Sequence, residues 1–419
     1  MVAMRLLLLS NTTGYQANAF REAAEHLGAE ITLATDRCHV LDDPWGDHAI
    51  PVKFHEPIES VKKIVGQAAK TKFDGIVAIG DAPTMTAAMA AEQLGLRFHP
   101  PAAVEACKNK WLARERWSAA GMRVPWYRRV PADESARELV QQVPFPCVLK
   151  PLGLSASRGV IRANVGSEFV GAFRRIGELL TESDIQLHRD DATSWIRIES
   201  YIPGQEFALE GVVTNGVLRV LALFDKPDPL EGPYFEETIY VTPSRIPEEQ
   251  QQAIFATTQQ AVTALGLSDG PIHAEMRLND EGVWMLEIAA RPIGGLCAKA
   301  LRFGENRMPL EELIVRHALG ENLEGLRREE QASGVMMIPI PEAGFYEGVD
   351  GVEKALTVPC VEEVEITAKL RQRLIPLPEG ASYLGFIFAR AESPEIVEDA
   401  LRQAHARLRF SISADIPVL

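Results

Sequence analysis

The chain has 419 residues, more than one hydrophobic core usually organises, and 46% of them are hydrophobic, so we expect two or three packed units. Lys and Arg number 43 against 58 Asp and Glu, which gives a formal net charge of -15. Such a charge repels nucleic acid and anionic lipid, so we expect neither nucleic acid nor a membrane surface as a partner.

The cysteines form no metal or redox motif. All five are scattered along the chain without a CxxC pair, and no cleavable signal peptide is recognised, which together predict reduced thiols and a cytoplasmic protein. The cysteines are Cys38, Cys107, Cys147, Cys297 and Cys360. The longest apolar run near the start, Leu6–Leu9, is far shorter than the roughly 20 residues that cross a bilayer, so no membrane span is expected.

The first part of the chain alternates apolar runs with stretches of helical spacing. Strands are expected at 4–10, 30–34 and 73–81. Helices are expected at 17–27, 60–69, 83–95 and 104–120. This alternation predicts a small parallel sheet covered by helices, and we place the end of this α/β unit near residue 105.

The rest of the chain has the pattern of antiparallel sheets with helices, which is an α+β architecture. Strands are expected at 145–151, 160–165, 195–202, 206–216 and 217–225 and in a hairpin at 273–290, with a helix at 167–180. Turn signals stand at Asn215-Gly216 and at 279–282. Beyond a second boundary near residue 332, another small α+β unit is expected, with strands at 335–341, 360–369 and 382–391 and a closing helix at 395–410.

A lysine followed by small residues is the first candidate for a phosphate site. Lys150 ends an apolar segment and precedes the run from Pro151 to Gly159, which includes Ser155 and Ser157. Such a loop can fold backbone N–H groups over phosphates, and a lysine supplies a mobile point charge. An ordinary surface turn has the same composition, so this string alone does not decide between the two.

Two carboxylates flank a tight Pro-Gly turn in IESYIPGQEFALEG. Glu199 and Glu206 so placed can accept hydrogen bonds from an adenine amino group and from ribose hydroxyls. Solvated strand carboxylates are the alternative interpretation.

The hairpin HAEMRLNDEGVWMLEIAA is the most informative segment. Glu275 and Glu287 lie on its two strands, and side chains on adjacent antiparallel strands can face each other at about 5 Å. Mg²⁺ prefers such oxygen ligands and commonly takes one or two carboxylates together with substrate phosphates. Apolar neighbours make an unpaired Glu287 costly to bury, and a metal ion removes that cost. The pair therefore predicts a metal site.

These segments, in this order and at about this spacing, resemble the ATP-grasp superfamily over roughly residues 4–330. The resemblance implies an N-terminal α/β domain at 1–105, an ATP-grasp domain at 106–331 with a lid at about 125–205, and a C-terminal α+β domain at 332–419.

The resemblance also implies a role for each candidate residue. Lys110, in KNKWLARERWSAAGMRVP, and Lys150 would contact phosphates, with Ser155 and Ser157 in the glycine loop. Adenine would lie against Glu199, Tyr201 and Ile202, and ribose against Glu206. Glu275 and Glu287 resemble the metal-binding pair, and Arg291 resembles the catalytic arginine that steadies the transferring phosphoryl group. The implied cofactors are ATP and Mg²⁺, with Mn²⁺ as an alternative ion.

Within the superfamily, the likeness is closest to the L-amino-acid ligases, which are carboxylate–amine ligases. It is carried by HAE before the hairpin, by EIAARPIGGLC after it and by DKPDPLEGPYFEETIYVTPS at 225–244, and the region from 332 resembles their C-terminal domain. The implied reaction joins a small-molecule carboxylate to an amine, both expected to be amino acids, through an acyl-phosphate with release of ADP and phosphate. Homodimers are common among these relatives.

One residue departs from the superfamily pattern. Many ATP-grasp enzymes carry Glu-x-Asn at the second metal position. Here the residue two positions after Glu287 is Ala289, which offers no side-chain oxygen. Either water and phosphate hold a second Mg²⁺ or catalysis is impaired, and because related ligases share the EIAAR form we favour the former.

Two further features stay open. His273 shares a strand face with Glu275, so it either touches substrate or orients a metal ligand, or it is a structural histidine. Segment 225–244, which holds Lys226 and Glu237, either closes over the acceptor and excludes water or is a proline-rich connector.

Two alternative functions are carried forward. A nucleotide-binding regulatory protein that has lost turnover is supported by Ala289 alone, because the lysines, the carboxylate pair and Arg291 remain. A carboxylase or purine-pathway ligase is compatible with the chain length, although the strings at 225–244 and 288–297 fit it less well. The sequence does not identify either substrate.

Overall fold

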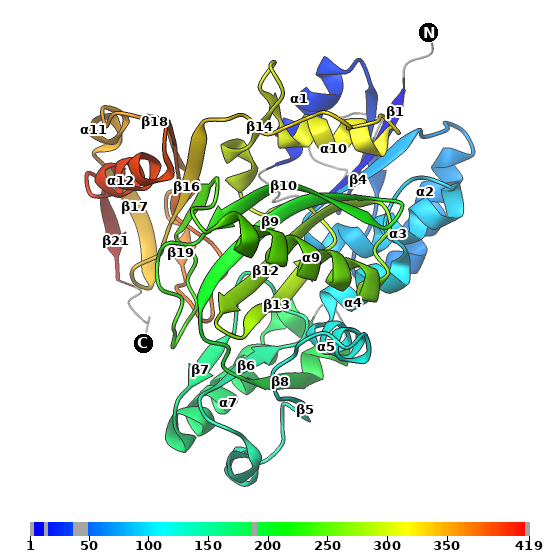
Figure 1. Cartoon of the computed structure of the whole chain (residues 1–419). Helices are drawn as coiled ribbons and strands as arrows, with labels where there is room; N and C mark the ends of the chain where they lie inside the picture. The colour runs from blue at the N-terminus through cyan, green and yellow to red at the C-terminus, as the bar shows by residue number, and fades with distance from the viewer. Residues whose placement is uncertain (1–3, 12–15, 37–48, 187–190, 415–419) are drawn as a thin grey trace.

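The computed structural model describes residues 4–11, 16–36, 49–186 and 191–414, so Cys38 lies outside the described residues. Four parts share one body, with the N-terminal unit, a central sheet and the C-terminal unit side by side and a lid projecting below them (Figure 1). Among the described helices, none combines the length and the apolarity that a membrane span needs.

The N-terminal unit is the predicted parallel sheet covered by helices. Its elements are β1 (Arg5–Ser10), α1 (Ala17–His26), β2 (Glu30–Thr35), β3 (Ala49–Pro51), α2 (Pro57–Ala68), β4 (Gly75–Ile79) and α3 (Asp81–Leu94). The strand order is β3-β2-β1-β4 and every pairing is parallel. From β1 the chain adds β2 and β3 on one side and then β4 on the other, so the strand order switches sides between β1 and β4. In such sheets, the loops that follow the two strands at this switch point form a binding crevice.

The helix predicted at 104–120 is two helices, α4 (Pro101–Lys108) and α5 (Lys110–Ala119). The prediction of one continuous helix was wrong because Asn109 between them is extended, with φ -101° and ψ 105°, and its side chain accepts hydrogen bonds from the backbone N–H groups of Trp111 and Leu112. This N-cap starts a new helix. The break leaves Lys110 as the first residue of α5.

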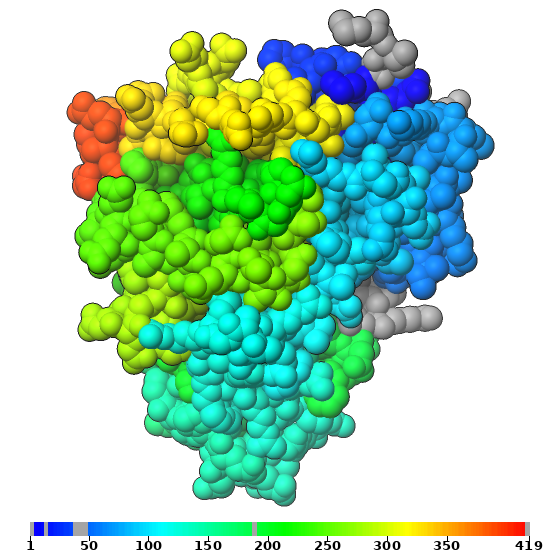
Figure 2. Space-filling model, turned by 45° about the vertical axis from the view of Figure 1, so that its right-hand side comes forward, coloured from blue at the N-terminus to red at the C-terminus, as the bar shows by residue number. Residues whose placement is uncertain are grey.

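The lid is a separate antiparallel sheet of four strands, in the order β5-β8-β6-β7. Its elements are β5 (Tyr127–Pro131), α6 (Ala136–Leu139), β6 (Cys147–Pro151), β7 (Ile161–Ala163), α7 (Gly166–Leu180), α8 (Ser183–Gln186) and β8 (Trp195–Ser200). The apolar face of α7, with Phe169, Phe173 and Ile176, covers the sheet and gives the lid its own core. In the space-filling view this part of the chain forms a protruding lobe (Figure 2).

The central sheet begins with two hairpins. The elements of this region are β9 (Gln205–Thr214), β10 (Val217–Asp225), β11 (Ile239–Thr242), α9 (Glu248–Leu265), β12 (Gly270–Asn279), β13 (Gly282–Ala289), β14 (Arg302–Phe303), β15 (Met308–Pro309) and α10 (Leu310–Ala318). Both predicted turns are present. Asn215 and Gly216 have φ of 50° and 79°, the left-handed pair that a two-residue hairpin turn requires, and this joins β9 to β10 in register.

The C-terminal unit shares its main sheet with the centre. Its elements are β16 (Ala332–Ile338), β17 (Gly344–Asp350), α11 (Val352–Leu356), β18 (Val361–Ile366), β19 (Arg373–Leu374), β20 (Gly385–Ala391), α12 (Pro394–His405) and β21 (Arg409–Ser413). One eight-stranded sheet runs β13-β12-β9-β10-β11-β16-β20-β18, because β11 pairs with β10 on one side and β16 on the other. The predicted boundary near 332 falls at the start of β16, yet the sheet is continuous across it.

The closing helix is shorter than predicted. It ends at His405 instead of residue 410, because 409–413 pair with β17 as the strand β21. The periodicity of ALRQAHARLRF fits a helix, and the pairing with β17 overrides it.

Candidate active site

A cavity of roughly 390 Å³ lies where the N-terminal unit, the lid, the central sheet and the C-terminal unit meet. Every predicted site residue lines it: Lys110, Lys150, Ser155, Ser157, Glu199, Tyr201, Ile202, Glu206, Glu275, Glu287 and Arg291. Residues that lie far apart in the sequence are therefore gathered around one space, as the sequence prediction required.

The two candidate metal carboxylates face each other across the β12–β13 hairpin. Glu275 is the direct register partner of Glu287, so both side chains leave the same face of the sheet. Their side chains are 24% and 31% exposed, so both open into the cavity instead of being sealed in the core. Paired, accessible carboxylate oxygens suit a hard divalent cation, and this donor set fits the metal that the sequence predicted.

Lys110 connects this pair to the glycine loop. Its Nζ lies 3.1 Å from Glu287 Oε2 and donates a hydrogen bond of 2.6 Å to the carbonyl oxygen of Leu154. The side chain is 10% exposed, so one buried ammonium touches both a carboxylate of the hairpin and the backbone of the loop.

Lys150 is held by Glu199, the residue predicted to meet adenine. Lys150 Nζ lies 2.6 Å from Glu199 Oε1, while Glu199 Oε2 lies 2.9 Å from Arg114 and 3.1 Å from Arg197. Burial would raise the pKa of Glu199, but Arg197, Lys150 and Arg114 hold it well below its ordinary value. Burial lowers the pKa of Lys150 in spite of Glu199. The structure therefore shows Glu199 as an anchor for a cation, which the sequence did not indicate.

The glycine loop between β6 and β7 has a left-handed backbone at several positions. Ala156, Ser157 and Gly159 have φ of 54°, 55° and 72°. Such conformations can turn successive N–H groups toward one side, as in anion-binding concavities, but here the N–H groups of Arg158, Gly159 and Val160 donate to the carbonyl oxygens of Ser155, Pro378 and Ser157. Gly159 has no alternative, because a Cβ there would lie 2.6 Å from the Pro151 ring.

The predicted adenine and ribose residues are tied together by Arg277. This guanidinium donates to the carbonyl oxygen of Ile202 at 2.7 Å and to Glu206 Oε2 at 2.9 Å, and it lies 5.1 Å from the ring centre of Tyr201. The other oxygen of Glu206 accepts from Lys226 at 2.9 Å. Arg277 and Lys226 are thus site residues that the sequence interpretation did not assign.

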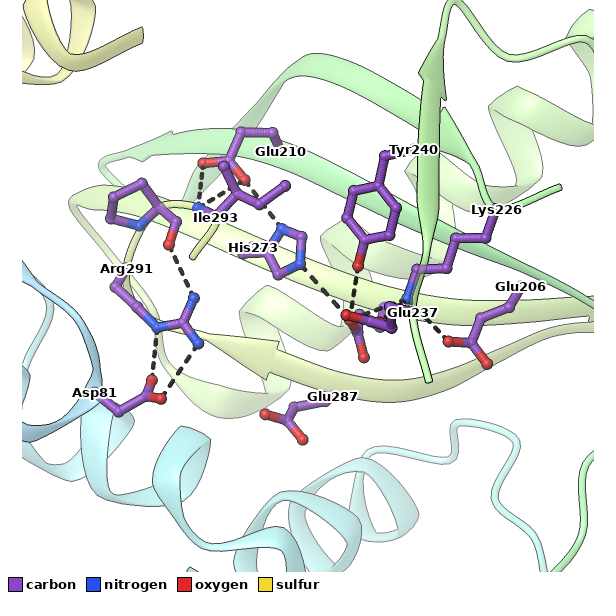
Figure 3. A network of polar contacts seen from close by, with 12 residues as sticks. Asp81, Glu206, Glu210, Lys226, Glu237, Tyr240, His273, Glu287, Arg291 and Ile293 are labelled. Carbon is purple, nitrogen blue, oxygen red and sulfur yellow. Dashed lines mark hydrogen bonds and ion pairs between the residues drawn. The ribbon is translucent and has the colours of Figure 1, made fainter. Parts of the chain in front are cut away.

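Arg291 reaches the cavity at its N-terminal side. Its Nε donates to Asp81 Oδ1 at 2.6 Å, its Nη2 lies 3.3 Å from Asp81 Oδ2, and its Nη1 donates to the Pro292 carbonyl (Figure 3). Burial opposes ionisation of Asp81, but Arg291 and Ser155 lower its pKa to about 2. Asp81 was not predicted, although its place at the carboxyl end of β4 is where α/β sheets bind ligands.

His273 bridges two carboxylates. Its Nδ1 lies 3.1 Å from Glu210 Oε2 and its Nε2 lies 3.7 Å from Glu275 Oε1. Burial alone would lower the pKa of His273, but Glu210 and Glu275 raise it to about 9. Glu210 also accepts the backbone N–H of Ile293, which fixes the segment after Arg291. Glu210 could have been found from the sequence, because it shares a strand face with Glu206.

Lys226 lies among three carboxylates at the far end of the network from Arg291 (Figure 3). Its Nζ is 2.9 Å from Glu206 Oε1, 3.1 Å from Glu275 Oε1 and in contact with Glu237 Oε1. Burial opposes its charge, but Glu206, Glu237 and Glu275 hold the pKa of Lys226 well above its ordinary value. The proline-rich segment 225–244 thus brings Lys226 and Glu237 into the site.

The remaining wall comes from the C-terminal unit. Met337 on β16 and Phe386 on β20 line the cavity with Tyr240 and Tyr383; the first three side chains are buried and that of Tyr383 is half-buried. Gly295 is adjacent, and a Cβ there would lie 2.9 Å from the Phe386 ring. The sequence did not indicate this wall, because it exists only through the pairing of β16 with β11.

Three family models match successive parts of the chain. They describe an ATP-grasp N-terminal domain at 21–97, an ATP-grasp domain at 143–300 and an L-amino acid ligase C-terminal domain at 336–413. The chain therefore contains an ATP-grasp domain, preceded by an ATP-grasp N-terminal domain and followed by an L-amino acid ligase C-terminal domain.

Among solved structures, an L-amino acid ligase from Bacillus licheniformis superposes with a TM-score of 0.83 at 25% sequence identity, over 98% of this chain and 99% of that one. An N5-carboxyaminoimidazole ribonucleotide synthetase from Thermotoga maritima also superposes, with a TM-score of 0.68 at 17% identity over 98% of this chain and 100% of that one, which shows the shared fold alone.

Among curated proteins, the alanine–anticapsin ligase of Bacillus subtilis is 27% identical over 250 residues, which cover 56% of this chain. The match spans 52% of that ligase's length, and a match to another curated relative spans 63% of its length. The likeness to amino-acid ligases seen in the sequence is thus supported by both kinds of comparison.

Proposed function

We propose that the protein is an ATP-dependent carboxylate–amine ligase that joins two amino acids and releases ADP and phosphate. The observation that carries this proposal is the meeting, in one cavity, of the facing pair Glu275 and Glu287 with the cations Lys110, Lys150 and Arg291. A carboxylate does not condense with an amine in water because oxide is a poor leaving group, so the carboxylate must first be phosphorylated.

In the proposed reaction, a carboxylate oxygen of the first substrate attacks the γ-phosphorus of ATP. The bond from that phosphorus to the β–γ bridging oxygen breaks, and ADP leaves. The amine nitrogen of the second substrate then attacks the acyl carbon, the bond to the phosphate oxygen breaks, and the nitrogen gives up a proton. The protein's part is positioning and charge stabilisation, which Lys110, Lys150 and Arg291 would supply.

In this proposal Glu275 and Glu287 hold the divalent cation, Mg²⁺ or Mn²⁺, which neutralises phosphate oxygens when bound. The glycine loop, with Ser155 and Ser157, would cover the phosphates. Adenine would lie against Tyr201 and Ile202, which follow β8. Lys110 reaches both a metal carboxylate and the loop, so it would couple the position of the loop to that of the metal.

The amino-acid substrates are inferred from the other half of the cavity. There the carboxylate of Glu237 suits an ammonium group, and the apolar wall of Met337, Tyr383 and Phe386 suits an apolar side chain. The similarity to an alanine–anticapsin ligase and to an L-amino acid ligase supports the same substrate class.

The test is a screen of amino acids, singly and in pairs, with MgATP and the full chain. ADP and phosphate release should depend on particular amino acids, and mass spectrometry should find a product equal to the two substrates less water. Glu287→Gln protein, prepared in the same way, is the blank for contaminating ATPases. Formation of AMP and pyrophosphate contradicts the proposal. A product formed only with bicarbonate indicates a carboxylase, and ATP binding without turnover indicates a regulatory protein.

A further inference from the structure

Lys226 is a buried cation enclosed by carboxylates from three segments of the chain. Glu206 comes from β9, Glu275 from β12, and Glu237 from the segment just before β11. The Lys226 side chain is 2% exposed, whereas the Glu237 and Glu275 side chains are 19% and 24% exposed. The lysine thus lies behind the carboxylates, which themselves face the cavity (Figure 3).

The three carboxylates converge as metal ligands would. One oxygen from each of Glu206, Glu237 and Glu275 can be chosen so that all lie within 4.8 Å of one another. Carboxylates at such separations repel each other, and a nearby cation or a shared proton relieves that repulsion. Lys226 Nζ touches an Oε1 of all three, at 2.9 Å for Glu206 and 3.1 Å for Glu275, so the ammonium already supplies that cation.

On the neighbouring strand β13, Glu287 is the carboxylate that faces Glu275. Ala289 on β13 pairs with His273 and lines the cavity with a methyl group. The other carboxylate oxygens gathered near Glu275 are those of Glu206 and Glu237, which Lys226 contacts, and the Tyr240 hydroxyl lies 3.5 Å from Glu275 Oε1.

We propose that Lys226 is a built-in cation: its ammonium fills the site that Glu206, Glu237 and Glu275 would otherwise offer to a divalent metal, and it confines metal binding to the Glu275–Glu287 side of the cavity. Lys226 is a positioning residue in this role, because it keeps Glu275 aimed by direct contact. The inference concerns the nucleotide-free protein, so it stands or falls separately from the ligase proposal.

The experiment counts Mn²⁺ ions by electron paramagnetic resonance on the full-length, nucleotide-free protein. Lys226→Met should gain one Mn²⁺ site. Its Kd should be lower by about tenfold or more than that of any Mn²⁺ binding to these carboxylates in the unaltered protein, because the ammonium that contacts all three has been removed. Lys226→Arg keeps the charge and should gain nothing. Adding Glu237→Gln to Lys226→Met should abolish the gained site.

The matched control is Lys299→Met, because Lys299 also contacts two carboxylates, Glu363 and Glu365, at 2.9 and 2.6 Å. These lie outside the cavity, so Mn²⁺ binding should stay unchanged. A folded Lys226→Met protein that binds no more Mn²⁺ than the original overturns the proposal. If Lys226→Met unfolds without metal, its melting is compared with and without MnCl₂: recovery of folding supports the proposal, and no recovery overturns it.

Discussion

The two ends of the cavity balance charge in opposite ways. At the proposed phosphate end, each of three cations pairs with one carboxylate: Lys110 with Glu287, Lys150 with Glu199 and Arg291 with Asp81. Glu199 also contacts two arginines. At the carboxylate end, Lys226 is surrounded by three carboxylates. The first end has positive charge left to offer an arriving anion, and the second has negative charge left to offer a cation or an ammonium group.

Two lysines show the difference most directly. Burial lowers the pKa of Lys150, which has one shared carboxylate, whereas Glu206, Glu237 and Glu275 overcome burial and raise the pKa of Lys226. The two lysines therefore differ in their surroundings: Lys150 contacts one carboxylate that two arginines also contact, and Lys226 contacts three carboxylates.

Glu287 stands between the two ends, and its loss should have the largest effect. We expect Glu287→Ala to lower kcat by about 10³-fold or more, because the phosphates lose a metal carboxylate, in line with the larger electrostatic losses measured at other active sites. The measurement is Mg²⁺-dependent ADP release with the melting temperature as a folding check. Glu281→Ala, at the exposed turn of the same hairpin, is the control. Near-normal activity in Glu287→Ala would remove Glu287 from the metal site.

Arg291→Lys tests whether the phosphate end needs a shape as well as a charge. We expect a loss on the order of 10²-fold in kcat, because a planar guanidinium spans two oxygens and an ammonium acts as one point. ATP affinity should change much less, since Lys110 and Lys150 remain. Nucleotide affinity and turnover are measured on one preparation, with Arg174→Lys on the exposed face of α7 as control. Equal losses in both would make Arg291 a ground-state contact only.

Asp81→Asn asks whether the N-terminal unit orients Arg291. The amide keeps the shape but removes the charge that meets the guanidinium at 2.6 Å, so we expect kcat to fall about tenfold, as a charged hydrogen bond is worth roughly 1.5 kcal/mol. The KM for ATP should hardly move. Asp74→Asn is the matched control, because Asp74 immediately precedes the first residue of β4. An unchanged kcat would mean that Arg291 is oriented without Asp81.

The smallest effect on activity at neutral pH is expected from His99 and His317, which lie outside the cavity. Burial lowers the pKa of each to about 4, so the folded protein keeps both rings neutral while the unfolded chain binds protons near pH 6.5. Their contribution to stability is therefore complete above pH 6.5, is lost as the pH falls toward 4, and levels off below. Between pH 7 and pH 5 each should cost about 2 kcal/mol of unfolding free energy.

Denaturant unfolding of His99→Gln at pH 7 and pH 5 checks this expectation. The loss of unfolding free energy between pH 7 and pH 5 should be smaller in the variant by about 2 kcal/mol, because glutamine does not titrate. Glutamine can still donate a hydrogen bond to the Pro271 carbonyl, which His99 meets at 3.1 Å. His55→Gln, at an exposed site, should leave the pH dependence as it is. If His99→Gln is equally acid-sensitive, the charges within the cavity control the response instead.

Much of the fold could be predicted because the signals are local. The buried run of β1 and the Asn215-Gly216 turn each depend on neighbours in sequence. The facing of Glu275 and Glu287 depends in addition on a register shift between Glu275 and Met276, because the register set by the turn alone would place Leu286 opposite Glu275. The break at Asn109 was missed because a polar residue between two helical patterns fits either one helix or an N-cap.

The rest of the site could not be predicted because it depends on contacts between distant segments. Asp81 meets Arg291 only through packing of the N-terminal unit on the central sheet, and Lys226 meets Glu206 and Glu275 only after three strands align. None of these contacts can be predicted from the local sequence. The residues proposed to bind nucleotide were named from short sequence motifs, whereas Asp81 and Lys226 join the cavity only through tertiary structure.

The shared sheet also limits how this chain can be divided. Strand β11 carries Ile239, Tyr240 and Val241 between the central strands and β16, and all three are buried. A chain cut at residue 331 would turn β11 into a bare, apolar edge, the kind of edge that pairs with other molecules and aggregates. The C-terminal unit and the central unit are therefore expected to fold together and not as separable modules.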